Sequence, residues 1–330
     1  MDIGFAEAGY DVVWSNDFDP VACETYRQNH PSTLNVCGSI VDAKKELSAL
    51  AGKIDLVFGG PPCQGFSVAG KMAPTDPRSK LIWEFLDVVR IVKPKGFVCE
   101  NVKALGVLEK WSSIRTEFIQ RAKSLGYSCE FIVLNSANHG CPQNRERVFF
   151  IGSRIKKVHS LKDEFRQIET AKISVRKALS ALGPAGSKNN RRVCKAKITL
   201  AKNPVMRTSP YAGMIFNGAG RPINIEGPSP TLPASMGGNK TPIIDEDALY
   251  KNKSPWVVNY HQQLIQGKRV SIKSPPAQLR RLTIDEAIVL QTFPKTYNFS
   301  GKGSAVYRQI GNAVPPKLAK AVALVARKFI

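Results

Sequence analysis

One cysteine of this chain follows directly after a predicted strand. Residues 54–58 are apolar apart from Asp55, with Ile54 and Val57 β-branched. They are followed by Gly59-Gly60, and the sequence continues Pro61-Pro62-Cys63-Gln64-Gly65-Phe66-Ser67. Two prolines restrict the backbone before Cys63, and Gly65 lets the next loop turn sharply. Ligands of open α/β sheets bind at the carboxyl ends of strands, where a rigidly held thiol suits covalent catalysis. From these residues alone, a structural cysteine in a tight turn remains an alternative.

Two further polar groups lie at predicted strand ends. Glu100-Asn101-Val102 ends the next strand, so it should lie beside the cysteine loop, where a carboxyl could protonate a substrate atom. A helix cap is the alternative. Gln143-x-Arg145-x-Arg147 precedes a strand, and alternate residues of a strand share one face. Both guanidinium groups could then hold an anion or a base edge, unless they form surface salt bridges.

The surrounding pattern predicts a sheet covered by helices. Short apolar runs alternate with helical spacing in the first half of the chain, which is typical of a doubly wound, Rossmann-like α/β fold. The predicted helices are 20–29, 81–92 and 114–125, and the predicted strands are 54–58, 97–101, 131–134 and 148–151, the last two as an edge hairpin.

Charge and composition divide the chain. Residues 1–155 hold 18 Lys/Arg and 17 Asp/Glu, a net charge of +1. Residues 156–330 hold 30 Lys/Arg and 9 Asp/Glu, a net charge of +21. A polyanionic partner explains this asymmetry better than solubility does. We therefore expect a catalytic domain over 1–155, a loop-rich basic domain over 156–275, and a segment over 276–330 that returns to the first. That segment holds a capping box, Thr283 with Glu286, and a terminal helix from Pro315-Pro316.

The seven cysteines are scattered and form no C-x-x-C pair, which argues against a disulfide framework or a zinc site. The sequence shows no signal peptide and no long apolar span, so we expect a cytoplasmic protein.

Taken together, the motifs resemble those of the DNA (cytosine-5) methyltransferase family. The matching segments, in order, are Pro62-Cys63-Gln64, Glu100-Asn101-Val102, Gln143-x-Arg145-x-Arg147, Arg281-Leu282-Thr283-x-x-Glu286 with Gln291-x-Phe293-Pro294, and Gly311-Asn312-x-Val314-Pro315-Pro316. The resemblance covers nearly the whole chain except about 155–275, where that family keeps its variable target-recognition region.

The resemblance implies a reaction and its residues. Cys63 would add to carbon 6 of cytosine, Glu100 would hold the ring at nitrogen 3, and Arg145 and Arg147 would grip the base oxygen and orient Glu100. The methyl donor would be S-adenosylmethionine, no metal would be needed, and the base would have to be flipped out of double-stranded DNA. Further substrate contacts are assigned to Gln64, Ser67, Thr231 and Leu232.

The same resemblance places the cofactor. Asp17 would bond the ribose hydroxyls, Phe18 would stack on adenine, and Ile40 would pack on its other face. Ser39 stands where the family usually has an aspartate, so that contact should be weaker or replaced. The remaining cofactor-lining positions are Pro62, Leu81, Asn312 and Val314.

One family element has no counterpart in this sequence. Family members begin with a strand and a Gly-rich turn, Phe-x-Gly-x-Gly-Gly, whereas Met1-Asp2-Ile3-Gly4-Phe5 resembles the segment that comes after that turn. We expect a reading frame that starts too late or is truncated. Because the first strand is central in a doubly wound sheet, two strands should lack a neighbour.

The leading hypothesis is a monomeric bacterial or phage DNA methylase that acts alongside a restriction endonuclease. A tRNA cytosine-5 methyltransferase is one alternative, although its Cys-Phe-Thr motif is absent from the recognition region. The other is a DNA-binding pseudoenzyme inactivated by the missing N-terminal segment.

Overall fold

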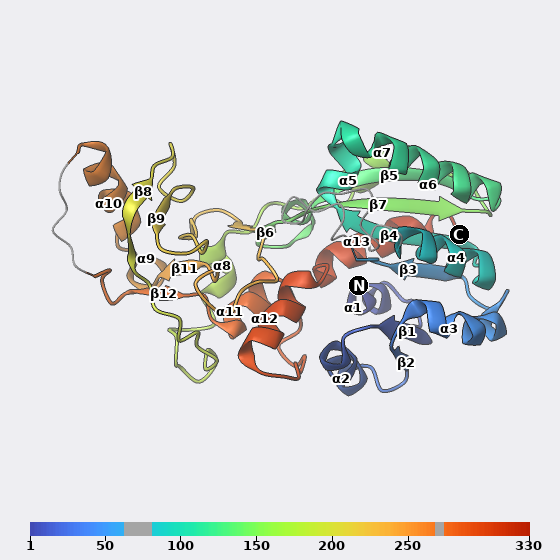
Figure 1. Cartoon of the computed structure of the whole chain (residues 1–330), viewed down its shortest axis with the longest axis horizontal. Helices are drawn as coiled ribbons and strands as arrows, with labels where there is room; N and C mark the ends of the chain where they lie inside the picture. Colours follow the sequence, from blue (N-terminus) through green and yellow to red (C-terminus); the bar gives the residue numbers. More distant parts are fainter. Residues whose placement is uncertain (63–80, 268–273) are drawn as a thin grey trace. The chain divides into compact units, whose positions relative to one another are not determined.

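The structure is a computed structural model that describes residues 1–62, 81–267 and 274–330 (Figure 1). The chain forms two compact units. The first comprises residues 1–139, 146–170 and 316–330, and the second comprises 140–145 and 171–315. The sequence predicted boundaries at 155 and 275. Residues 276–315 belong to the second unit because their apolar side chains join its core, and only α13 (Pro316–Arg327) returns to the first.

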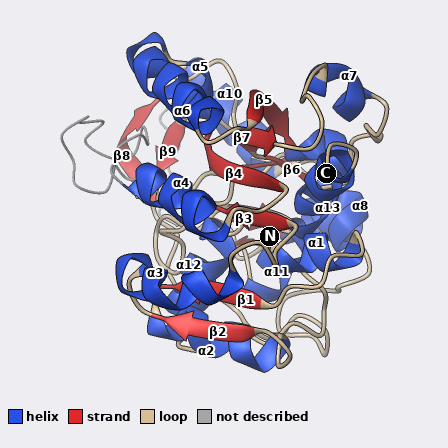
Figure 2. Ribbon diagram, turned by 90° about the vertical axis from the view of Figure 1, so that its right-hand side faces the viewer, coloured by secondary structure: helices blue, strands red, loops and turns tan. Residues whose placement is uncertain are grey.

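A four-stranded sheet forms the centre of the first unit. Its order is β3 (Leu56–Gly59), β4 (Gly96–Val102), β7 (Glu146–Ser153) and β5 (Ser128–Asn135) (Figure 2). Strands β3 and β4 run parallel, whereas β7 is antiparallel to both of its neighbours. The predicted pairing of 131–134 with 148–151 at the sheet edge is confirmed.

Strands β1 (Trp14–Asp17) and β2 (Leu34–Cys37) form a separate parallel pair in the first unit. Among the residues that the structure describes, β1 pairs only with β2, and β3 pairs only with β4. Within the described residues, β1, β2, β3 and β5 are therefore edge strands.

Helices cover both sides of the larger sheet, with α4 (Leu81–Val92) and α6 (Ser112–Ser124) on one side and α1 (Asp2–Glu7) and α13 on the other (Figure 2). Apolar residues of α4 at helical spacing are buried against the sheet. The core on this side includes the buried rings of Phe97, Phe118 and Phe150. Further helices of this unit are α2 (Pro20–Asn29), α3 (Ile40–Leu47), α5 (Lys103–Val107) and α7 (Leu161–Arg166).

Short elements build the second unit. They are β6 (Gln143–Asn144), α8 (Val175–Leu179), β8 (Leu200–Val205), β9 (Met214–Phe216), β10 (Ser229–Pro230), β11 (Ile243–Asp245), α9 (Glu246–Lys251), α10 (Trp256–Ile265), β12 (Leu279–Arg281), α11 (Ile284–Leu290) and α12 (Gly303–Asn312). The predicted capping box begins α11, since Thr283 and Glu286 each accept the other's backbone N–H. Arg280 links α9 to α11 through ion pairs of 2.7 Å with Glu246 and Glu286.

Within residues 1–62, 81–267 and 274–330, every helix is too short or too polar to span a bilayer.

Candidate active site

The carboxyl ends of β3 and β4 lie side by side in the first unit. Parallel pairing matches Gly59 with Cys99, so the next residues, Gly60 and Glu100, are also neighbours. A Cβ atom placed on Gly60 would lie 2.7 Å from Oε2 of Glu100, so the carboxylate rests against bare backbone. The chain runs from Gly60 through two prolines to Cys63. Glu100 thus lies beside the segment that leads to the cysteine, as the strand order predicted.

An ion pair holds the Glu100 carboxylate in place. Antiparallel pairing of β4 with β7 sets Arg147 opposite Val102, and Nε of Arg147 lies 2.9 Å from Oε1 of Glu100. The two side chains are only 16% and 12% exposed, so solvent screens their attraction weakly. A carboxylate bonded to a fixed guanidinium has a defined position and orientation, which a group that transfers a proton requires.

Asn101 ties the same strand end to the proline turn. Its side chain is 1% exposed, and its Nδ2 donates to the carbonyl oxygen of Pro61 over 3.3 Å. Its Oδ1 accepts the N–H of Val102. The sequence prediction assigned Asn101 no separate role, and the available signal was its place between Glu100 and Val102.

The predicted nucleophile Cys63 and the predicted substrate contacts Gln64 and Ser67 lie outside the described residues. Other cysteines are poor nucleophiles where burial stabilises the neutral thiol. Burial raises the pKa of Cys99 and of Cys129 well above the usual thiol range. The pKa of Cys23 rises to about 12, first through burial and then through its hydrogen bond with Cys37.

The close approach at Gly60 gives a testable prediction. Gly60→Ala should displace the Glu100 carboxylate, because the new methyl group would occupy its position. A misplacement of about 1 Å at a reacting group can cost about 100-fold in rate, so we expect turnover to fall by about 10- to 100-fold. The fold should persist, since the clash is with the flexible end of a side chain.

Gly59→Ala is the matched control for that variant. Among the described residues, a methyl group on Gly59 would meet the ring of Phe85 alone, at 3.5 Å, an ordinary contact distance. Methyl transfer and thermal unfolding would be measured for both variants. Equal turnover of the two proteins would contradict the placement of Glu100 against Gly60.

An acidic residue and an exposed aromatic ring end strand β1. Asp17 is the last residue of β1, and its Oδ1 accepts the N–H of Asp19 over 2.8 Å. The ring of Phe18 is 78% exposed, which is unusual for so large an apolar side chain in a protein with a well-filled core. A carboxylate for ribose hydroxyls beside a free ring for a purine fits the adenosine part of S-adenosylmethionine.

The other predicted cofactor residues of the first unit lie at element ends. Ser39 caps α3, where its hydroxyl accepts the N–H of Val41, and Ile40 is the first residue of that helix. The capping bond uses the hydroxyl of Ser39. Leu81 begins α4, and Pro62 is the last residue described before residues 63–80.

The second unit contains Gln143 and Arg145, both almost fully buried. Arg145 lies between β6 and β7, which belong to different sheets, so Arg145 and Arg147 do not alternate along one strand as the sequence predicted. Their described partners also differ. Arg145 donates to the carbonyl oxygens of Leu232 and Asn312, whereas Arg147 binds Glu100.

The same part of the second unit holds the remaining predicted residues. Thr231 donates through its hydroxyl to the carbonyl oxygen of Asn144 over 2.7 Å, and its side chain is exposed. Leu232 is fully buried. Asn312, the last residue of α12, is exposed, whereas Val314 is buried. The structure therefore brings the backbones of Leu232 and Asn312 to the buried Arg145, and Thr231 bonds to the neighbouring Asn144.

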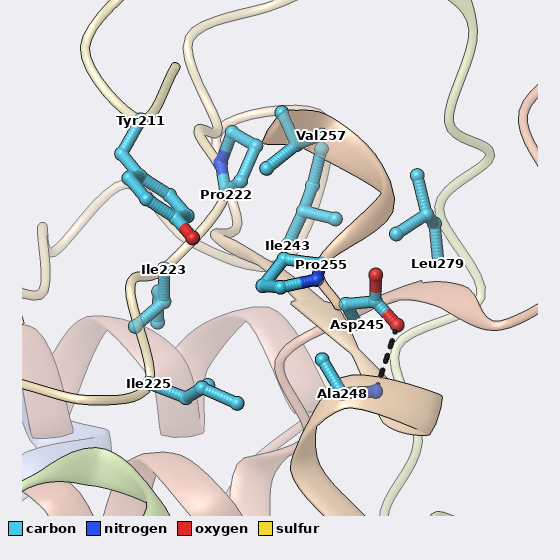
Figure 3. A pocket seen from close by; sticks show the side chains of 10 residues that line it. All are labelled: Tyr211, Pro222, Ile223, Ile225, Ile243, Asp245, Ala248, Pro255, Val257 and Leu279. Carbon is cyan, nitrogen blue, oxygen red and sulfur yellow. Dashed lines mark hydrogen bonds between the residues drawn. The ribbon is translucent and has the colours of Figure 1, made fainter. Parts of the chain in front are cut away.

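A small apolar pocket also lies in the second unit, lined by residues that include Tyr211, Ile243 and Leu279 (Figure 3). Its volume of about 10 Å³ is that of a single water-sized sphere. The carboxylate of Asp245 in its wall already caps α9 through the N–H of Ala248. The pocket is therefore too small for a nucleobase or a cofactor.

Comparison with known proteins identifies the family of the chain. Residues 1–328 match the family model described as C-5 cytosine-specific DNA methylase. The chain is 31% identical over 355 residues to the type II methyltransferase M.XorII of Xanthomonas oryzae, covering 98% of this chain and 80% of that one. It is 31% identical over 338 residues to the type II methyltransferase M1.HphI of Haemophilus parahaemolyticus, and the match covers 97% of this chain and 82% of that one.

Solved structures show the same fold. A DNA modification methyltransferase encoded in an Escherichia coli prophage superimposes with a TM-score of 0.68 at 21% identity, over 99% of this chain and 95% of that chain. The Schizosaccharomyces pombe Dnmt2 methyltransferase superimposes with a TM-score of 0.68 at 19% identity, with the same coverage.

Proposed function

Because this chain belongs to the C-5 cytosine-specific DNA methylase family and is a DNA (cytosine-5-)-methyltransferase that uses S-adenosylmethionine, we propose that it is the modification enzyme of a type II restriction system. It methylates cytosine within one short DNA sequence, and a restriction endonuclease of the same specificity is its functional counterpart. This role is supported by type II methyltransferases that match this chain over nearly its whole length.

We further propose that catalysis is covalent and begins at Cys63. Carbon 5 of cytosine is a poor nucleophile, so the Cys63 thiolate adds to carbon 6 and makes carbon 5 electron-rich. Glu100 holds ring nitrogen 3, where electron density accumulates, and supplies a proton there. Bound S-adenosylmethionine supplies the methyl group. The carbon 5 proton then passes to water, the Cys63 thiolate is eliminated from carbon 6, and Glu100 takes back the proton from nitrogen 3, which restores the aromatic ring and both side chains.

The observation that carries this proposal is the Glu100–Arg147 ion pair beside Gly60. It sets a fixed carboxylate next to the segment leading to Cys63, which is the arrangement that acid-assisted addition of a thiol requires. Asp17 and Phe18 would hold the adenosine part of S-adenosylmethionine, with Asn312 and Val314 as further cofactor contacts. The base must leave the helix to reach such a site, and the basic second half of the chain supplies phosphate contacts.

Bisulfite sequencing of DNA from cells that express the chain tests the function. One short motif should contain protected cytosines, and a Cys63→Ser variant should leave none. Unmethylated DNA, or methylation of tRNA instead, would overturn the proposal.

A further inference from the structure

Four segments of the second unit meet around two buried side chains. Gln143 is fully buried, and its Oε1 accepts the N–H of Leu232 over 3.1 Å. Its Nε2 donates to Oε1 of Gln291 over 2.5 Å. Gln291, also fully buried, donates in turn to the carbonyl oxygen of Ala313 over 2.6 Å. A chain of side-chain hydrogen bonds therefore runs from Leu232 to Ala313.

Arg145 also joins the segment containing Leu232 to the segment containing Ala313. Its Nη1 donates to the carbonyl oxygen of Leu232 over 3.4 Å and its Nη2 to that of Asn312 over 3.3 Å. The peptide groups of Leu232 are thus bound on both sides, the N–H by Gln143 and the carbonyl by Arg145. The backbones also touch, because a Cβ atom on Gly311 would lie 2.5 Å from the N atom of Ala234.

We propose that Arg145 is a positioning residue, and that with Gln143 and Gln291 it forms a clamp that fixes the Thr231–Leu232 segment against the Asn312–Val314 segment. This inference rests on the proposed function, in which the first segment contacts DNA and the second contacts the cofactor. Arg145 then acts without touching the base. A guanidinium suits the task, because its planar fork reaches two carbonyl oxygens at once.

The clamp makes DNA reading and cofactor binding depend on the same bonds. Buried polar groups of this kind are costly to leave unpaired, so the network has one favoured arrangement. Loosening it should let both segments shift. A residue that gripped the base would instead affect turnover and leave cofactor affinity in the absence of DNA unchanged.

The test uses Arg145→Lys in the full chain. A lysine ammonium keeps the charge but can reach only one of the two carbonyl oxygens. The dissociation constant for S-adenosylmethionine without DNA should rise by about 10-fold, since one buried bond to a charged group is lost. Discrimination between the preferred site and sites with one mismatch should fall by a similar factor. Gln291→Glu, which cannot donate to Ala313, should weaken cofactor binding in the same way.

Arg281→Lys is the matched control. Arg281 is also buried in the second unit and donates to two carbonyl oxygens, those of Thr241 and Lys197, which lie outside both segments. The Arg281→Lys substitution should lower the melting temperature. It should change cofactor affinity, and discrimination between the preferred and mismatched DNA sites, by no more than about 2-fold.

Two results would overturn the clamp. One is an Arg145→Lys protein with reduced turnover and unchanged cofactor affinity, which would place Arg145 at the base. The other is an equal loss of cofactor affinity and site discrimination in the Arg281→Lys protein, which would show a general loosening of the second unit. Cofactor affinity is measured without DNA, so the clamp is tested even if the wild-type chain methylates no cytosine, a result that would count against the proposed function.

Discussion

Replacing Cys63 with serine is expected to lower methyl transfer by about 10³-fold or more, the scale of loss seen when a covalent nucleophile is removed. A cysteine thiol forms the nucleophilic thiolate far more readily than a serine hydroxyl forms an alkoxide, so serine is a much weaker nucleophile. DNA affinity should change little, because the basic residues of the second half of the chain are untouched.

Methylation is measured with labelled S-adenosylmethionine, and DNA binding by fluorescence anisotropy. Cys194→Ser is the control, since it makes the same replacement at a half-buried cysteine of the second unit. A Cys63→Ser protein that turns over at the normal rate would rule out covalent catalysis through this residue.

Replacing Glu100 with glutamine should produce the second-largest loss. The amide fills the same space and can still accept a bond from Arg147, but it cannot transfer a proton to ring nitrogen 3. Removal of a positioned general acid typically costs about 10² to 10⁴ in rate. The loss should appear in kcat, with DNA affinity preserved.

Glu146→Gln provides the comparison for this variant. Glu146 adjoins Arg147 but pairs with Lys103 over 2.8 Å at an exposed position, where an ion pair contributes little to stability. Circular dichroism melts would confirm that both variants fold. If Glu100→Gln and Glu146→Gln were equally active, Glu100 would have no part in the chemistry.

Local sequence signals were enough to predict the elements that carry the site. The helical spacing of Leu81 to Val92 and the capping box of Thr283 both appear in the structure as expected. The neighbouring positions of Gly60 and Glu100 followed from the rule that successive parallel strands pair, and β3 and β4 do pair. These features depend on residues close together in the sequence or on common topology.

The contacts that the sequence did not reveal join distant residues. Arg145 meets Leu232 and Asn312, which lie 87 and 167 residues away, and no periodicity encodes such a bond. The break between β6 and β7 could not be predicted either, because the alternate positions of Arg145 and Arg147 fit a single strand and no glycine or proline separates them. Residues 276–315 were assigned to the first domain from motif order, although their apolar faces pack in the core of the second unit.

Trapping on DNA that carries 5-fluorocytosine tests the covalent mechanism most directly. Fluorine at carbon 5 cannot leave as a proton does, so the protein should remain bonded to carbon 6 after methyl transfer. In the presence of S-adenosylmethionine, a protein–DNA complex stable to denaturing electrophoresis should form, and mass spectrometry should map the bond to the peptide containing Cys63. A protein that methylates ordinary DNA but forms no such complex, or forms it at another residue, would contradict the assignment of Cys63.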